Sequence, residues 1–328
     1  MEIRNLQKTG GSSYNITLPK QWIKSLRLTE KDRIEIFFQN KHQLGIRPHT
    51  SHTLPTSILF VDNLSNEQIF REIIAYYLSG VSEITIQTNT MTYELRSLVR
   101  TFSNKLMGFE IFDTTNNKIT LKNVSTNTVP VSDYINKMIN IIISMYEDME
   151  TSILTNNKKL ARDIIDRDVE VDRIELVMIR QLNVLLYSLF PTETSDLFLL
   201  ERHYYEHIAI RLERIADHVV RIANTFLQLK EKDSLILTKP EKDRIKKVYK
   251  YLIECNEMIK NLDKRKAHEL LDYFESINKN EFINKKTINK SSLNILIEDS
   301  IERIRSYIAN IAEETINYYA IKRIQSSA

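Results

Sequence analysis

The position of the glycines constrains the fold of this chain more than any other sequence feature. All five lie in the first third of 328 residues, four of them before position 81. Glycine is disfavoured inside helices and is often required in tight turns, so the later two thirds must contain few such turns. Apolar residues there recur at three- and four-residue steps, the spacing of one helix face. We predict long helices with short connections, an arrangement typical of antiparallel bundles, near 132–155, 158–189, 196–230, 239–262, 264–279 and 290–325.

The chain before these helices divides into two shorter segments. Residues 1–52 combine a Gly-Gly turn with short alternating strands and one helical turn, which begins at Pro19. Residues 54–128 alternate strands with helices, as in a small α+β layer. We therefore predict a multidomain fold: a small β domain (1–52), an α+β middle layer (54–128) and an all-α domain (131–328).

Charge is concentrated at the N-terminus. Residues 1–50 carry nine Lys/Arg against four Asp/Glu, whereas the whole chain has a net charge of only +3. A small basic module indicates an anionic partner, most often nucleic acid. About fifty residues with so few apolar groups make a poor independent core, so we expect this module to dimerise. The candidate DNA-binding residues are Arg4, Lys8, Lys20, Lys24 and Arg27.

Composition limits the class of protein. No apolar run approaches the ~18 residues that span a bilayer, and the N-terminus has no signal-peptide pattern. The single cysteine, Cys255, excludes an internal disulfide and a multi-cysteine metal site. We expect a soluble cytoplasmic protein that is not an integral membrane protein.

Two pairs of acidic residues interrupt the helical pattern. Asp168 and Asp172 are four residues apart, as are Glu213 and Asp217, so each pair lies on one face of its helix. Reading both helices at alternating four- and three-residue steps places the pairs on apolar faces. Ionised carboxylates are rarely buried without a cation or hydrogen-bond partners. The four residues therefore mark either a metal site, since carboxylates suit hard or borderline cations, or a polar network.

The polar-network alternative has its own candidates. The acids could be neutralised by nearby arginines, namely Arg167, Arg173 or Arg214. Glu175 and Glu206 lie on the same predicted faces and favour a metal. A ferritin-like oxidase would need Glu-x-x-His pairs, which the chain lacks. A lone helical histidine is more often a partly exposed polar residue than a ligand, so we leave out of the site His203, His207 and His218.

The helical part contains an internal repeat. Residues 210–217 (IRLERIAD) recur 89 positions later as residues 299–306 (DSIERIRS). Such self-similarity predicts two three-helix repeats, about 131–230 and 239–328.

These residues resemble two known families. Residues 168–172 (DVEVD) with 212–217 (LERIAD) are similar to the PhoU family of phosphate-uptake regulators. That resemblance implies tandem three-helix bundles whose E/D-x-x-x-D motifs bind iron, zinc or other metal clusters, here through the two acid pairs. Residues 8–13 (KTGGSS) with 16–20 (ITLPK) resemble an AbrB/MazE-type (SpoVT-AbrB) swapped-hairpin DNA-binding domain. This second resemblance implies a homodimer in which Arg4 and Lys24 match positions that contact DNA.

The chain departs from both patterns at three positions. Ser306 replaces the aspartate that would pair with Glu302, so we expect the second-half metal site to be degraded or absent. Arg221 stands where the PhoU pattern has asparagine, and Arg27 stands where the AbrB pattern has glycine.

Together the resemblances imply a phosphate-responsive transcriptional regulator of phosphate uptake, with a DNA-binding N-terminal domain and a metal-binding sensor domain. Expected partners are promoter duplex DNA, a second copy of the chain, and the ATPase of a phosphate transporter or another phosphate carrier. The alternative is a regulator that acts by contact on a transporter, with the AbrB-like domain only dimerising. A metal-dependent hydrolase or oxidase is a third reading, but the sequence offers no clear nucleophile, so we expect no enzyme activity.

Overall fold

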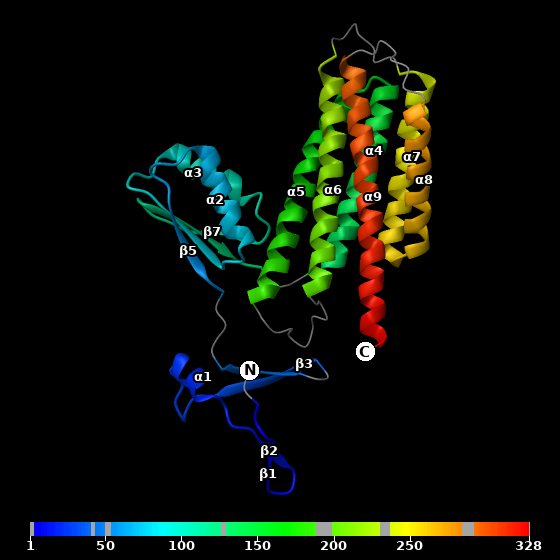
Figure 1. The fold of residues 1–328 in the computed structure, drawn as a ribbon. Coiled ribbons are helices and arrows are strands. Elements are labelled where there is room, and N and C mark those ends of the chain that lie inside the picture. The colour runs from blue at the N-terminus through cyan, green and yellow to red at the C-terminus, as the bar shows by residue number, and fades with distance from the viewer. Residues whose placement is uncertain are drawn as a thin grey trace. The chain divides into compact units, whose positions relative to one another are not determined.

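The computed structural model describes residues 3–40, 43–49, 54–125, 129–187, 199–229, 237–283 and 292–327. These residues fall into two compact units, one within residues 1–53 and one that begins at Leu54. The expected sequence of a small β region, an α+β region and a helical region is confirmed (Figure 1).

The N-terminal unit consists of two hairpins and a short helix. Strands β1 (Gln7–Thr9) and β2 (Ser13–Asn15) pair antiparallel, and the turn between them uses Gly10 at a φ of +69°. Helix α1 (Lys20–Ser25) follows. Strands β3 (Ile34–Asn40) and β4 (Gln43–Pro48) form the second hairpin. Gly45 of β4 lies under the ring of Phe37, where a Cβ atom would come within 1.9 Å of the ring.

No side chain described in this unit is fully buried. Even the large side chain of Trp22 is only partly buried. Ile36 and Phe38 of β3 are 68% and 81% exposed. So many exposed apolar side chains leave the unit without a closed core of its own. Others with large exposed areas are Ile3, Leu6, Tyr14, Ile16, Leu26 and Leu44.

The α+β layer is a four-stranded sheet packed against two helices. Its strand order is β5-β6-β8-β7, with β5 and β6 parallel and the other pairs antiparallel. Ile73, Tyr77, Ile84 and Leu121 are completely buried in its core. The elements are β5 (Thr56–Phe60), α2 (Asn66–Leu78), β6 (Glu83–Gln87), α3 (Tyr93–Ser103), β7 (Phe109–Thr114) and β8 (Lys118–Asn123).

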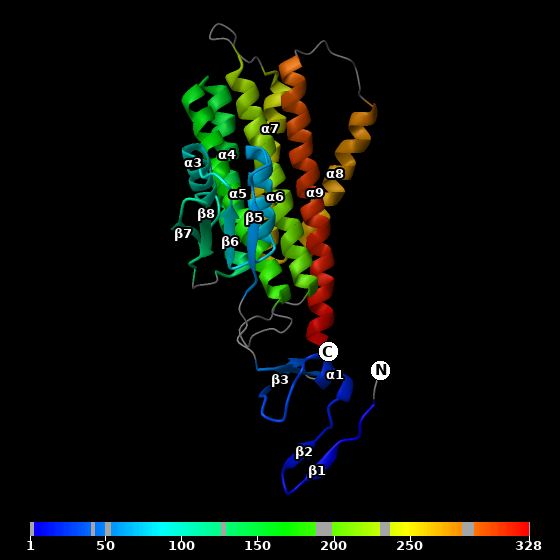
Figure 2. The same cartoon turned by 90° about the vertical axis from the view of Figure 1, so that its left-hand side faces the viewer.

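Six long helices run side by side through the rest of the described chain (Figures 1 and 2). Helices α4, α5 and α6 pack on one another, as do α7, α8 and α9, while α6 lies along α9 and α4 along α7. One continuous apolar core joins both sets. The helices are α4 (Val131–Leu154), α5 (Lys158–Tyr187), α6 (Leu199–Leu227), α7 (Lys239–Asn261), α8 (Lys264–Ile283) and α9 (Ser292–Ser327).

The sequence repeat has a structural counterpart in the core. Residues of α6 and their equivalents 89 positions later in α9 are both buried: Leu212 with Ile301, Ile215 with Ile304, and Ile222 with Ile311. The two copies of the repeat therefore share their buried apolar positions.

Arg180 of α5 fastens the α+β layer to the helices. Its guanidinium is nearly buried and donates to the backbone oxygens of Tyr77 and Val81 at 2.6 and 2.7 Å. It also lies 4.7 Å from the ring centre of Phe109. Asn183, one turn further, donates to Leu78 O at 2.8 Å. These carbonyls belong to the end of α2 and the turn after it, where helical partners run out.

No helix in the described part of the chain is both long and apolar enough to cross a bilayer. Cys255 of α7 is completely buried, and burial raises the pKa of its thiol to about 12. That environment is typical of an inert core residue.

Candidate functional site

The two predicted acid pairs lie on neighbouring helices, α5 and α6, but not on the apolar faces that the sequence suggested. The buried face of α5 includes Ala161, Ile164 and Val171, and that of α6 includes Leu212 and Ile215. The acids are displaced to the flank of each buried face and are half-buried. The predicted face was wrong because the alternating four- and three-residue steps were drawn through the acids. The residues that are buried in the core are the apolar ones beside those acids.

Burial and the charges of neighbouring acids raise the pKa values of Asp168, Asp172 and Glu213. The pKa of Asp168 rises to about 7 through burial and through the charges of Asp172 and Asp217. The pKa of Glu213 rises to about 8 through burial and through Asp217 and Glu175. Because each group responds to acids on both helices, the four predicted residues form one cluster.

Glu175 joins the same cluster. Its pKa rises to about 7, first through burial and then through the charge of Asp172. Burial together with Asp217 also raises the pKa of Asp172. We call the five residues Asp168, Asp172, Glu175, Glu213 and Asp217 the acidic cluster. Glu206, the other acid that the sequence singled out, forms an ion pair with Arg202 at 2.9 Å instead.

One of the three candidate arginines neutralises part of the acidic cluster. Arg214 lies 3.4 Å from Glu213 Oε2 and 3.0 Å from Asp217 Oδ2. The side chain of Arg214 is 54% exposed, so water screens its effect. The pKa values of Glu175 and Glu213 stay raised despite Arg214, because burial and the charges of neighbouring acids outweigh its effect.

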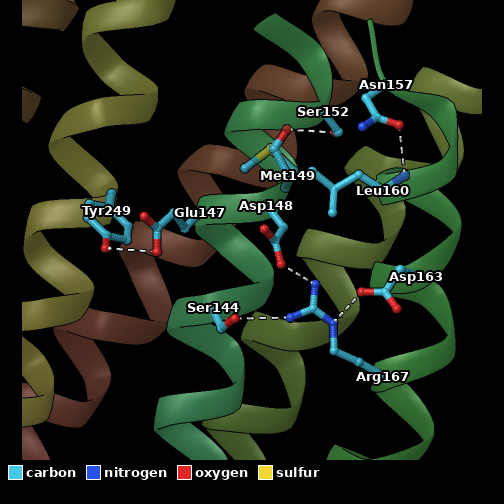
Figure 3. A network of polar contacts seen from close by, with 10 residues as sticks. All are labelled: Ser144, Glu147, Asp148, Met149, Ser152, Asn157, Leu160, Asp163, Arg167 and Tyr249. Atoms are coloured by element: carbon cyan, nitrogen blue, oxygen red, sulfur yellow. Dashed lines mark hydrogen bonds and ion pairs between the residues drawn. The ribbon is translucent and has the colours of Figure 1, made fainter. Parts of the chain in front are cut away.

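Arg167 serves a different network, between α4 and α5 (Figure 3). Its guanidinium contacts Asp148, Asp163 at 3.0 Å and Ser144 at 3.0 Å. These contacts tie α4 to α5 and draw the arginine away from the acidic cluster. For Arg167, the polar-network alternative is therefore not realised.

The acidic cluster fits a metal by its donor chemistry. Half-buried carboxylates with raised pKa values are stabilised when a cation neutralises them, and several oxygens suit a hard or borderline cation. As placed, the side chains do not form a closed cage. Among the described residues, the group of three or more potential metal ligands whose ligand atoms all lie within 4.8 Å of one another is His203, His207 and Glu314, not the acidic cluster.

In the second half, Glu302 is the acid that corresponds to Glu213, and it lies close to two arginines. Glu302 contacts Arg305 and lies 4.0 Å from Arg244. Ser306 donates to the backbone oxygen of Glu302 at 2.9 Å and offers no second carboxylate. Arg221 turns to Asp299 of α9 at 3.1 Å. This arrangement gives the second half the charge balance of a salt-bridged network.

The predicted DNA-binding residues all lie in the N-terminal unit, and all are exposed: Arg4, Lys8, Lys20, Lys24 and Arg27. Arg4 donates to Thr17 Oγ1 at 3.5 Å. Arg27 has a φ of +54°, a left-handed conformation that glycine adopts without strain. The departure noted at this position in the sequence is thus a real backbone cost.

Two of the three histidines that the sequence analysis left out of the site, His203 and His207, form a closer group with Glu314 than the acids do with one another. His207 Nδ1 lies 2.8 Å from Glu314 Oε1, and the ring centres of His203 and His207 are 3.8 Å apart. The four-residue spacing of the histidines was visible in the sequence. Glu314 lies 107 positions later, on α9, and nothing local connects it to them.

Two separate segments of the chain match models of known protein families. Residues 135–226 match the family model of the PhoU domain. The match contains all five residues of the acidic cluster and ends within α6. Residues 7–53 match the model described as "Antidote-toxin recognition MazE, bacterial antitoxin". Both resemblances that the sequence suggested are therefore confirmed, each for its own segment.

Two solved structures are similar to the chain. The crystal structure of PhoU from Pseudomonas aeruginosa is 19% identical, with a TM-score of 0.49, over 57% of this chain and 93% of that one. The phosphate transport system regulatory protein PhoU from Streptococcus pneumoniae is 21% identical, with a TM-score of 0.48, over 57% and 91%. A search of curated proteins finds no match.

Proposed function

We propose that the chain is a cytoplasmic, homodimeric regulator of phosphate uptake that binds promoter DNA through its N-terminal unit and senses its signal through the PhoU-matching helices. One observation carries the proposal: a segment matching the MazE model and a segment matching the PhoU domain occur in the same chain. The resemblance to phosphate-uptake regulators supplies the process, and the AbrB/MazE resemblance supplies the DNA.

Charge in the N-terminal unit supports the DNA-binding part. Its five candidate side chains are exposed, so each is accessible to a DNA phosphate. Dimerisation would repeat this basic surface by two-fold symmetry. Such symmetry matches the two half-sites of a palindromic operator in duplex DNA. Neutralising DNA phosphates releases counterions, which makes affinity fall steeply with salt.

The acidic cluster supports the sensor part. It lies inside the PhoU-matching segment, and the resemblance implies iron or zinc there. Asp168, Asp172, Glu213 and Asp217 would hold the metal, and Glu175 adds a fifth carboxylate beside them. A bound cation would supply positive charge that draws the carboxylates of α5 and α6 together. We propose no catalytic role for these residues.

A second function is favoured by the exposed apolar residues of the N-terminal unit. The exposed side chains of Ile36 and Phe38 are suited to one half of a dimer interface. A unit that served only to dimerise would need such an interface. In this alternative the unit only joins two chains, and the helical part regulates a phosphate transporter by direct contact with its ATPase or carrier.

The test is fluorescence anisotropy of the full chain on duplex DNA from its own promoter region, across a salt series. We expect the deletion of residues 1–52 to abolish binding. The variant Lys24→Ala should weaken binding and reduce the slope of log affinity against log salt by about 1. The matched control Lys242→Ala removes an exposed lysine from α7 and should bind as the unaltered chain does.

Equal and weak binding by the full chain and the deletion, even at low salt, would contradict the DNA-binding proposal. In that outcome, retention of phosphate regulation by the deletion would favour direct contact with a transporter. Loss of regulation on deletion, without DNA binding, would favour the dimer-only role of the N-terminal unit.

A further inference from the structure

We propose that His203 and His207 of α6 and Glu314 of α9 form a second metal site, separate from the acidic cluster, that takes Zn²⁺ and clamps the two helices together. The site does not depend on the proposed regulatory function. It arises from three side chains of two helices whose ligand atoms lie within 4.8 Å of one another.

The geometry requires only small movements to accept an ion. His207 Nδ1 and Glu314 Oε1 are 2.8 Å apart, a hydrogen-bond distance. Two ligands on one tetrahedral zinc, each about 2.0–2.2 Å from the ion, lie about 3.3 Å from each other. An opening of about half an ångström therefore converts the hydrogen bond into a shared metal. His203 lies one helical turn before His207, so the same face presents both imidazoles.

The donor set selects among metals. Two imidazoles and one carboxylate suit zinc and other divalent transition metals, whereas Mg²⁺ and Ca²⁺ prefer oxygen ligands. Glu314 is largely buried, and its carboxylate would offset part of the ion's charge. His203 is exposed, so a fourth position on the ion would face solvent and hold water.

Arg211 is the group that competes with a metal for Glu314. Its guanidinium lies 3.9 Å from Glu314 Oε1, at the outer limit of an ion pair. The same guanidinium donates to the backbone oxygen of His207 at 3.3 Å. Arg211 could keep that hydrogen bond while the ion takes the carboxylate. Zinc binding would therefore cost only the long ion pair between Arg211 and Glu314, besides the hydrogen bond between His207 and Glu314.

The position of the site gives it a structural consequence. Helix α6 ends the first three-helix set and α9 ends the second, and the two lie side by side in both views (Figures 1 and 2). A metal shared between them would fix their register at one point. The acidic cluster, by contrast, lies between α5 and α6 and involves only the first set.

The test is titration of the full, chelator-treated chain with Zn²⁺ against a chromophoric chelator, which gives stoichiometry and affinity. We expect His203→Gln to weaken one zinc equivalent by at least about tenfold, because even outer-shell changes at metal sites cost that much. His203 is exposed, so this variant should fold normally. Glu314→Gln should have the same effect, and Mg²⁺ should not compete.

Two controls separate this site from other sources of binding. His268→Gln removes an exposed histidine from α8 and should leave every equivalent unchanged. Glu213→Gln alters the acidic cluster and should spare the equivalent that depends on His203. The proposal is overturned if His203→Gln and Glu314→Gln bind zinc as the unaltered chain does, or if Mg²⁺ displaces that equivalent at similar concentrations. Then His207 and Glu314 form only an ion pair between helices.

Discussion

At the scale of single residues, the acidic cluster shows how burial and like charge act together. Glu213 is 16% exposed and is surrounded by other acids, and its pKa rises to about 8. A carboxyl whose pKa is raised in the folded chain is stabilising below its unfolded pKa and loses that contribution as pH rises through the folded value. The cluster is therefore a local source of instability at neutral pH, which a bound cation would relieve.

The pH dependence of stability tests this directly. In the presence of a chelator, the free energy of unfolding should fall as pH rises from about 4.5 to about 8, the interval between the unfolded and folded pKa values of Glu213. Glu213→Gln removes the charge and should raise stability at pH 8 by on the order of 2 kcal/mol, with little change at pH 5. Urea unfolding at the two pH values measures both effects.

Glu170→Gln is the matched control, because Glu170 lies on α5 near the cluster but is 45% exposed and paired with Lys137 at 2.6 Å. It should change stability by less than about 0.5 kcal/mol at either pH. A Glu213→Gln variant that is no more stable than the unaltered chain at pH 8 would show that the cluster is already neutralised.

At the scale of secondary-structure elements, Arg180 explains how α5 holds the α+β layer. The end of α2 and the turn that follows present the backbone oxygens of Tyr77 and Val81, and Arg180 donates to both, in addition to the bond that Tyr77 O accepts from Gly80 N–H. An arginine serves here because its planar group donates in several fixed directions at once, and its aliphatic stem can lie in apolar surroundings.

Substitution of Arg180 should loosen that attachment. Arg180→Leu removes the side-chain donor of Val81 O and leaves Tyr77 O with only the Gly80 N–H at 3.1 Å, so it should cost on the order of 3 kcal/mol in the free energy of unfolding. Arg180→Lys should cost less, since one ammonium can reach one of the carbonyls. Hydrogen exchange at the end of α2 should rise together with the loss of stability. Arg162→Leu, at an exposed position of α5, is the control and should have little effect.

At the scale of the whole molecule, the N-terminal unit is the part that cannot be complete alone. Its described residues include no fully buried side chain, while Ile36 and Phe38 expose most of their area from the same strand. Alternate residues of a strand lie on one face, so these two side chains form a single apolar surface. Such a surface is stable in water when another copy covers it.

The expected result is a concentration-dependent dimer that depends on this strand. Phe38→Glu places a charge in the proposed interface and should convert the chain to a monomer at micromolar concentration in sedimentation velocity. Phe112→Glu changes an equally aromatic residue, 65% exposed on β7, and should leave the dimer intact. A Phe38→Glu variant that still sediments as a dimer would place the interface elsewhere.

Helix and strand positions followed from the sequence because they depend on local patterns. Helices α4 (Val131–Leu154) and α7 (Lys239–Asn261) lie where apolar spacing predicted them, near 132–155 and 239–262. The basic composition of the first fifty residues and the pairing of acids at four-residue steps are equally local. The 89-residue repeat is likewise visible in the sequence, and the structure shows that its apolar positions are buried in both α6 and α9.

The tertiary structure alone decided which side chains meet. Spacing could not distinguish the buried face of α5 from its flank, because acids and apolar residues alternate at similar steps. Glu314 reaches His207, and Arg180 reaches α2, across more than a hundred positions of the chain. Sequence periodicity specifies which face of a helix is apolar, but helix packing specifies which polar residues on two faces come within bonding distance.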